Sequence, residues 1–294
     1  MNKVLILASL IAMTHIDADA QTFIGRQTPK IENRTLTPEA LWAMGRVGGA
    51  SVSPDAKSIT YNVSYYSVAE NKSHTVIYVI NSDGTGERLL TSAKTSELSP
   101  KFIAGGKKIA FLTADSDGTM QVWQMNPDGT ERVQLSHEKE DVEDFTFSVN
   151  ERKVILVKSI QYGKRTKDLY PDLEKASGRV ITGLMHRHWD EWVENIPHPY
   201  VADFDGTAIR GAKDLLEDEP YECPMKPFGG IEQLTFSPDG KQIAYTCRKL
   251  EGKDYACSTD ADIYIYDIET GKTKNICKPE GYVRPAIDYT ESLK

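Results

Sequence analysis

Residues 233–245 read Gln-Leu-Thr-Phe-Ser-Pro-Asp-Gly-Lys-Gln-Ile-Ala-Tyr, and this stretch decides the fold class of the chain. Leu234 and Phe236 alternate with polar residues, as in a short strand with one buried face. The Ser-Pro-Asp-Gly segment at 237–240 is a tight-turn signal, because proline presets one backbone angle and glycine accepts a positive φ. The Ile-Ala-Tyr segment at 243–245 begins a returning strand, so the stretch predicts a β-hairpin.

Weaker copies of this hairpin lie upstream, at 52–61, 102–111 and 147–156. The equivalent turn residues are Asp55, Gly105, Asn150 and Asp239, which are 50, 45 and 89 positions apart. The last interval is about twice the others. It therefore holds either two units or one unit with an insertion.

A second element follows most of these hairpins: an alternating strand, a turn containing glycine, and a short outer strand. It occurs at 76–91, 121–136 and 262–276. Two hairpins per unit give four antiparallel strands, and a period near 45 residues is typical of a propeller blade. Unrelated hairpins in a β-sandwich are the alternative, but the fixed order of the elements favours the propeller.

The predicted fold class is therefore all-β, a partial β-propeller of about four to five four-stranded blades over residues 49–282. The predicted blades lie near 50–91, 98–136, 144–212 and 233–277, and 283–294 forms an irregular tail that loses the pattern.

The N-terminal residues 1–20 are expected to be a secretory signal peptide. A lysine precedes a ten-residue apolar run, and Ala-Asp-Ala ends the segment at Ala20. The apolar run is too short for a membrane span, so a soluble protein that is exported to the periplasm is predicted. In the N-terminal segment 21–48, Thr37-Pro-Glu39 predicts the start of a short helix that Gly48-Gly49 ends.

The four cysteines all lie late in the chain, at Cys223, Cys247, Cys257 and Cys277. Cys247 and Cys257 lie on either side of a short loop, so a disulfide between them is one expectation for an exported protein. Four cysteines allow three sets of pairings, and free buried thiols are the alternative. Their spacing does not favour a structural zinc site.

The period-two pattern stops at Gln161 for some 40 residues. This region contains Lys164-Arg-Thr-Lys-Asp-Leu-Tyr-Pro-Asp-Leu173 and Arg187-His-Trp-Asp-Glu-Trp192. With the Ser-Pro-Asp-Gly hairpins, it resembles the bacterial dipeptidyl peptidases of the prolyl oligopeptidase family over nearly all of 37–282. The hairpins alone indicate only a TolB-like propeller, whereas the 187–192 block is more specific.

The resemblance implies the N-terminal propeller of a serine exopeptidase that gates and orients peptide substrates. Such enzymes have seven or eight blades and a C-terminal α/β-hydrolase domain with a Ser, Asp and His triad. This chain reaches Lys294 after four or five blades, and no Gly-x-Ser-x-Gly nucleophile motif occurs in it. We therefore expect a truncated form without the hydrolase domain, with no catalytic residue and no peptidase activity of its own.

The resemblance also directs attention to the carboxylates Asp190, Glu191 and Glu194, flanked by Trp189 and Trp192. A dipeptidyl peptidase must hold the α-ammonium group of its substrate, and carboxylates are the natural counter-charge. A solvated loop with structural aromatic residues is the alternative. His186, His188 and Asp190 alternate and could share one face, but ordinary polar loop residues explain them better than a metal site does.

The net charge of −8 comes from interspersed residues, with no basic stripe that would favour nucleic-acid binding. No cofactor is expected, and peptides are the expected partners. Two other functions stay open: a free-standing exported propeller that binds peptide or protein, and an unrelated enzyme whose propeller holds the active site.

Overall fold

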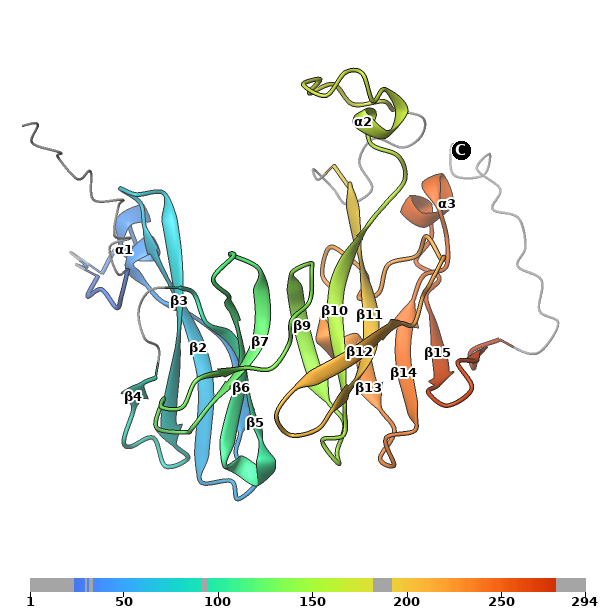
Figure 1. Cartoon of the computed structure of the whole chain (residues 1–294). Coiled ribbons are helices and arrows are strands. Elements are labelled where there is room, and N and C mark those ends of the chain that lie inside the picture. The colour runs from blue at the N-terminus through green and yellow to red at the C-terminus, as the bar shows by residue number, and fades with distance from the viewer. Residues whose placement is uncertain (1–23, 30, 32–33, 91–94, 182–191, 279–294) are drawn as a thin grey trace, which may run out of the picture.

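The computed structural model describes residues 24–29, 31, 34–90, 95–181 and 192–278, and within them it confirms the all-β prediction. The predicted signal peptide and the predicted tail at 283–294 lie outside these residues. In this described part of the chain, sixteen strands form four antiparallel sheets, each of four strands, arranged side by side as successive blades (Figure 1).

Each blade is a contiguous segment of the chain. Blade 1 contains β1 (Arg46–Val52), β2 (Ser58–Ser67), β3 (Lys72–Asn81) and β4 (Arg88–Leu89). Blade 2 contains β5 (Leu98–Ile103), β6 (Lys108–Ala114), β7 (Met120–Met125) and β8 (Val133–Gln134). Blade 3 contains β9 (Val142–Phe147), β10 (Lys153–Gln161), β11 (Asn195–Phe204) and β12 (Ile209–Asp214). Blade 4 contains β13 (Leu234–Phe236), β14 (Gln242–Cys247), β15 (Asp262–Asp267) and β16 (Thr273–Asn275).

Helices are short in the described residues. They are α1 (Pro38–Ala43), α2 (Thr166–Leu169) and α3 (Gly252–Cys257), with single 3₁₀ turns η1 (Ala104–Gly106) and η2 (Ile231–Gln233). None of these helices is long and apolar enough to cross a membrane.

The first helix begins as the sequence predicts but ends early. Thr37 Oγ1 accepts a hydrogen bond from Ala40 N at 3.2 Å, which caps the start of α1. The prediction that Gly48-Gly49 ends this helix is wrong, because both glycines belong to β1. The pairing of β1 with β2 shifts register between Gly48 and Ser51, and Gly49 has φ +55°. A side chain at Gly49 would clash with Asn62, so glycine serves this bulge.

The repeated turn owes its shape to one side-chain motif. In blade 4, Ser237 Oγ donates to Asp239 Oδ1 at 2.6 Å, and Lys241 N donates to the same oxygen at 3.1 Å. These bonds lower the pKa of Asp239, with the Ser237 hydroxyl as the largest cause. Ser53 and Asp55 repeat the contact in blade 1 at 2.7 Å. The turn sequence therefore sets the register of the first hairpin locally.

Apolar residues on alternate positions of the inner strands hold neighbouring blades together. In β6, Ile109 and Phe111 pack toward blade 1, whereas Ala110 and Leu112 pack toward blade 3. In β10, Val154 and Leu156 face blade 2, and Ile155 and Val157 face blade 4. Both faces of these strands are buried, as expected for sheets stacked on both sides.

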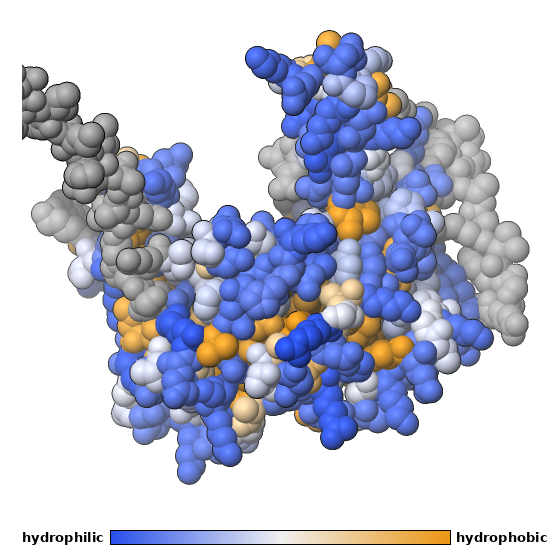
Figure 2. Space-filling view, in the orientation of Figure 1, coloured by the Kyte–Doolittle hydropathy of each residue, from blue (hydrophilic) through white to orange (hydrophobic). Residues whose placement is uncertain are grey.

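The connections between the second and third strands of all blades lie at one end of the sheets, which we call the rim. They are residues 68–71, 115–119, 162–194 and 248–261. The rim carries α2 and α3, and α1 lies at the same end (Figure 1). The long connection of blade 3, residues 162–194, is the insertion that the sequence predicts. Its described residues, 162–181 and 192–194, stand above a mainly hydrophilic surface, while hydrophobic residues gather in a band across the sheets (Figure 2).

Candidate functional site

The sequence-predicted site residues fall at the end of the insertion. Trp192 and Glu194 are described by the structure. Trp189, Asp190 and Glu191 lie outside the described residues, as do His186 and His188. Among the residues that are described, no group of three His, Cys, Asp or Glu side chains is placed to hold a metal ion.

Hydrogen bonds close the base of the insertion onto the sheet. Tyr162 N donates to Glu194 O at 2.9 Å, which extends the pairing of β10 with β11 by one step. Arg165 Nη2 donates to Asn195 Oδ1 at 2.9 Å. Asp168 Oδ2 accepts from Arg165 N at 2.8 Å and from Gln161 Nε2 at 2.7 Å. These two bonds lower the pKa of Asp168, the backbone bond being the larger cause, and fix the turn into α2.

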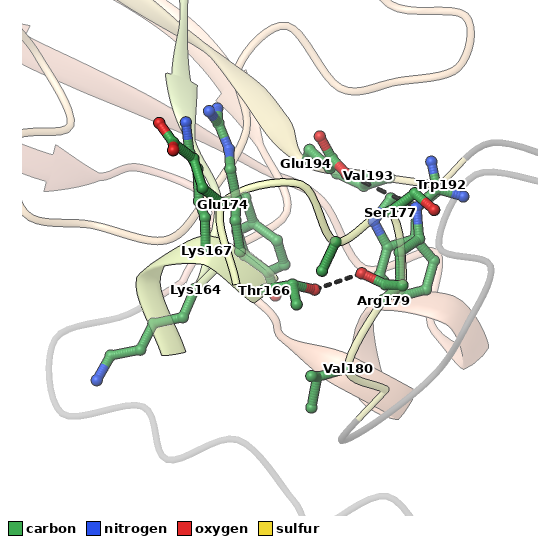
Figure 3. Close-up of a pocket in the computed structure, with 14 residues that line it drawn as sticks. Lys164, Thr166, Lys167, Glu174, Ser177, Arg179, Val180, Trp192, Val193 and Glu194 are labelled. Atoms are coloured by element: carbon green, nitrogen blue, oxygen red, sulfur yellow. Dashed lines mark hydrogen bonds and ion pairs between the residues drawn. The ribbon is translucent and has the colours of Figure 1, made fainter. Parts of the chain in front are cut away.

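A hollow of about 360 Å³ lies within the insertion, and we call it the insertion pocket (Figure 3). Its lining comes from the two ends of the insertion: Tyr162, Lys164–Lys167, Glu174, Ala176–Val180 and Trp192–Glu194. Thr166 Oγ1 donates to Gly178 O at 2.5 Å and ties α2 to the returning chain. The volume is within the range of small-ligand sites.

Glu194 already has a cationic partner in this pocket. Arg179 Nε lies 3.7 Å from Glu194 Oε1, and the Arg179 guanidinium lies 5.0 Å from the centre of the Trp192 ring. Both charged side chains are about half exposed, so water weakens their attraction. A substrate ammonium group would therefore have to share the Glu194 carboxylate with Arg179.

A second, larger hollow of about 920 Å³ lies on the rim between blades 2 and 3, and we call it the acidic groove. Its lining residues are Asp117–Thr119, Lys139–Asp141, Glu143, Ser159–Gln161, Arg165, Asn195 and Tyr200. The set contains four carboxylates and two basic side chains. Arg165 lines both hollows, so the acidic groove and the insertion pocket adjoin at the base of the insertion.

The four carboxylates of the groove differ in how they are used. Asp141 Oδ1 accepts a hydrogen bond from Met120 N at 2.8 Å. The Glu143 carboxylate accepts a hydrogen bond from the Ser159 hydroxyl, and its Oε2 lies 3.9 Å from Lys226 Nζ. Asp117 and Glu140 are exposed, and their carboxylates have no hydrogen bond or ion pair within the described residues. The groove thus offers free negative charge to a cationic ligand.

Sequence reasoning missed the acidic groove. Asp117 comes from the 115–119 connection of blade 2, Glu140 and Asp141 from the segment between β8 and β9, and Glu143 from the start of β9. All four precede the insertion in sequence. The acidic run Glu138-Lys-Glu-Asp141 followed by Glu143 was visible, but nothing in its spacing places it beside Arg165.

Buried polar contacts hold Tyr200, a wall residue of the groove. Lys158 Nζ lies 2.6 Å from Glu138 Oε2 and 3.9 Å from the centre of the Tyr200 ring. Burial, followed by the Asp214 carboxylate, raises the pKa of the Tyr200 hydroxyl. His198 Nδ1 lies 2.9 Å from Asp214 Oδ2 deeper in the blade. These contacts keep the groove wall in place before any ligand arrives.

The predicted Cys247–Cys257 disulfide is absent, since all four cysteines are free thiols in the structure. Cys247 is fully buried on β14, where its Sγ lies 3.4 Å from Glu222 O. Cys257 ends α3 and is exposed. The intervening residues form a helix rather than the simple loop assumed from the sequence, which leaves one thiol in the core and the other at the surface.

Comparisons with known proteins agree with this architecture. No family model matches the chain. The dipeptidyl-peptidase 5 of Porphyromonas gingivalis is 45% identical over 241 residues, which cover 82% of this chain and 35% of that protein. The dipeptidyl-peptidase 5 of Porphyromonas endodontalis is 42% identical over 245 residues, 83% of this chain and 35% of that protein. The chain therefore spans about a third of the length of these curated relatives.

Among solved structures, an acylaminoacyl peptidase of Pyrococcus horikoshii superposes with a TM-score of 0.51 at 14% identity. The match covers 80% of this chain and 33% of that one. At this identity the likeness concerns the fold alone. The sequence relationship is much closer, and it includes the greater part of the four blades. The chain is therefore a relative of dipeptidyl-peptidase 5, and its matching region is a propeller.

Proposed function

We propose that this chain is the propeller part of a dipeptidyl-peptidase 5-like serine exopeptidase and that it binds and orients the free N-terminus of peptide substrates. The acidic groove carries the proposal, together with the relationship to dipeptidyl-peptidase 5. Its free carboxylates, Asp117 and Glu140, lie on the rim beside the insertion. A peptide α-amino group is mostly protonated at neutral pH, with a pKa near ~8, so it requires such acceptors.

The insertion contributes a second set of acceptors in this proposal. Asp190, Glu191 and Glu194 remain our proposed contacts to the ammonium group, with Trp189 and Trp192 as walls. Glu194 supports this assignment in part, because it lines the insertion pocket next to the groove. Its contact with Arg179 makes it the weaker acceptor of the set.

Binding by the chain itself tests the proposal. We expect trialanine with a free N-terminus to bind at least about tenfold more tightly than its N-acetyl form, the scale of one charge-assisted hydrogen bond. Changing Glu140→Gln should reduce this preference. Glu70→Gln is the matched control, since Glu70 is an exposed carboxylate on the same rim outside the groove. Equal affinity for the free and acetylated peptides would contradict the proposal.

Catalysis is not expected from this chain alone. A serine peptidase needs a nucleophile, a base and an orienting acid in one constellation, and no Gly-x-Ser-x-Gly segment is present. Purified protein should leave dipeptidyl-coumarin substrates uncleaved. Turnover blocked by a serine-directed phosphonate would contradict this expectation.

Export to the periplasm is the remaining part of the proposal. It is supported by the apolar run and the Ala-Asp-Ala ending before Gln21. N-terminal sequencing of protein from the periplasmic fraction should begin at Gln21, and retention of Met1 there would refute the assignment.

A further inference from the structure

The insertion pocket carries the opposite charge balance from the acidic groove. Among the residues that the structure describes, four basic side chains line it, Lys164, Arg165, Lys167 and Arg179, against two acidic ones, Glu174 and Glu194. One of the two carboxylates is occupied, because Glu194 is the ion-pair partner of Arg179. The described lining of the pocket is therefore positive, although the sequence directs attention to the carboxylates of the insertion.

Two of the basic groups have unused capacity to donate hydrogen bonds. Arg165 Nη2 binds Asn195, but Arg165 Nε is buried and has no hydrogen-bond partner in the described part of the chain. Lys167 is exposed, and within those same residues its ammonium group makes no hydrogen bond or ion pair. Lys164 lines the pocket too, but its side chain extends away from the other labelled groups (Figure 3).

The rest of the wall suits the end of a peptide better than a free inorganic anion. Val180, Val193 and the Trp192 ring supply apolar surface beside the cations (Figure 3). The Thr166 hydroxyl donates to Gly178 O and is not free for a ligand. A ligand with one carboxylate and an apolar body matches this combination.

We propose that the insertion pocket binds a carboxylate of the peptide ligand, most simply its C-terminal carboxylate, through Arg165, Lys167 and Arg179. The inference rests on the proposed function with the ammonium group held in the acidic groove by Asp117 and Glu140. The insertion pocket, where Glu194 is paired with Arg179, is then left for the other end of the peptide. Arg165 lines both hollows, so a short peptide can place one charged end in each. The preferred ligands are then short peptides with both ends free.

Isothermal titration of the whole chain with four forms of trialanine tests this inference. The forms are the free peptide, the N-acetyl peptide, the C-terminal amide and the doubly capped peptide. We expect amidation to weaken binding at least about tenfold, as for the loss of a charge-assisted hydrogen bond. In Lys167→Ala, binding of the free acid should weaken up to about fivefold, the scale of an exposed charge contact, and the effect of amidation should shrink.

The control variant is Lys175→Ala, because Lys175 is an exposed lysine of the insertion that does not line the pocket. It should leave the effect of amidation unchanged. A further peptide, Ala-Ala-Asp amide, separates the two sources of a carboxylate. Binding as tight as that of the free acid would show that a side-chain carboxylate serves as well as the C-terminal one, which would overturn the assignment to the C-terminus.

The outcomes separate this inference from the proposed function. If acetylation weakens binding and amidation does not, the carboxylate pocket is refuted while recognition of the N-terminus stands. If amidation weakens binding and acetylation does not, the reverse holds. Absence of binding by all four peptides, or equal loss in Lys167→Ala and Lys175→Ala, would overturn the inference.

Discussion

The ion pair between Glu97 and Arg132 is expected to be a main support of the junction between blades 1 and 2. Glu97 lies directly before β5 and is 1% exposed. Both terminal nitrogens of Arg132 donate to its carboxylate, Nη2 at 3.2 Å. The same Nη2 donates to Leu90 O of blade 1 at 2.7 Å, and the guanidinium lies 5.3 Å from the centre of the Phe111 ring. Arg132 therefore links two blades through one group.

Replacing Arg132→Met keeps the apolar stem of the side chain and removes its charge. The buried Glu97 carboxylate then loses the Arg132 guanidinium, and removing one partner of a well-buried ion pair costs about 3–5 kcal/mol. The Arg132 side chain is 23% exposed, so water can replace part of the lost contact and the lower value applies. A loss of about 3 kcal/mol lowers Tm by about 6–12 °C in a chain of this size.

Thermal unfolding followed by circular dichroism measures this effect, and a double-mutant cycle isolates the pair. The double variant with Glu97→Leu and Arg132→Met should recover most of the lost stability, because no charge is left buried. Lys153→Met is the control. Lys153 Nζ lies 2.6 Å from Asp203 Oδ1, and the Asp203 side chain is 71% exposed. Removing the Lys153 charge should therefore change the free energy of unfolding by less than about 1 kcal/mol. If Arg132→Met and Lys153→Met lower Tm equally, burial does not set the strength of the pair.

Three further predictions concern the core, the turns and the thiols. Phe145→Ala should destabilise the protein by about 3–5 kcal/mol, since the ring is fully buried between blades 2 and 3; a urea-unfolding midpoint close to wild type would contradict this. Hydrogen bonds, the largest contribution coming from the Thr207 hydroxyl, lower the pKa of Asp205 in the folded protein. The ionised Asp205 carboxylate therefore stabilises the fold at pH values above its unfolded pKa, and this stabilisation is lost as the pH falls. Asp205→Asn should flatten the decline in Tm between about pH 5 and pH 2. Burial raises the pKa of the Cys223 thiol and the buried thiols are shielded, so a thiol reagent should label only Cys257 and Cys277 in the native protein, and all four after unfolding in denaturant.

The sequence predicts the blades well because their information is local. The Ser-Pro-Asp-Gly turn at 237–240 makes its bonds within six residues, and period-two apolar patterns set which faces are buried. The prediction that Gly48-Gly49 ends the first helix is wrong because glycine occurs both at helix ends and at strand bulges. Only the pairing of β1 with β2 distinguishes a bulge from a helix end here.

The candidate site depends on contacts that sequence patterns do not encode. The carboxylates of residues 190–194 predict an acidic site, yet Glu194 lies beside Arg179, which is fifteen positions upstream. The acidic groove combines side chains from two blades with Arg165 of the insertion. Such neighbours are set by how blades stack and how the insertion folds back, so they required the three-dimensional structure.

Each blade is a meander of neighbouring strands, and this order matters while the chain is being synthesised. A ribosome delivers β1 to β4 before any residue of blade 2, so each sheet can pair as soon as it emerges. The next blade then covers the face that the previous one leaves open, as β6 does with Phe111. Blade 3 is the exception, because residues 162–194 must emerge between β10 and β11. During that interval the β9–β10 hairpin can pack only against blade 2, and the face of β10 that carries Ile155 stays uncovered until blade 4 has been synthesised. The insertion therefore delays the completion of blade 3 during synthesis.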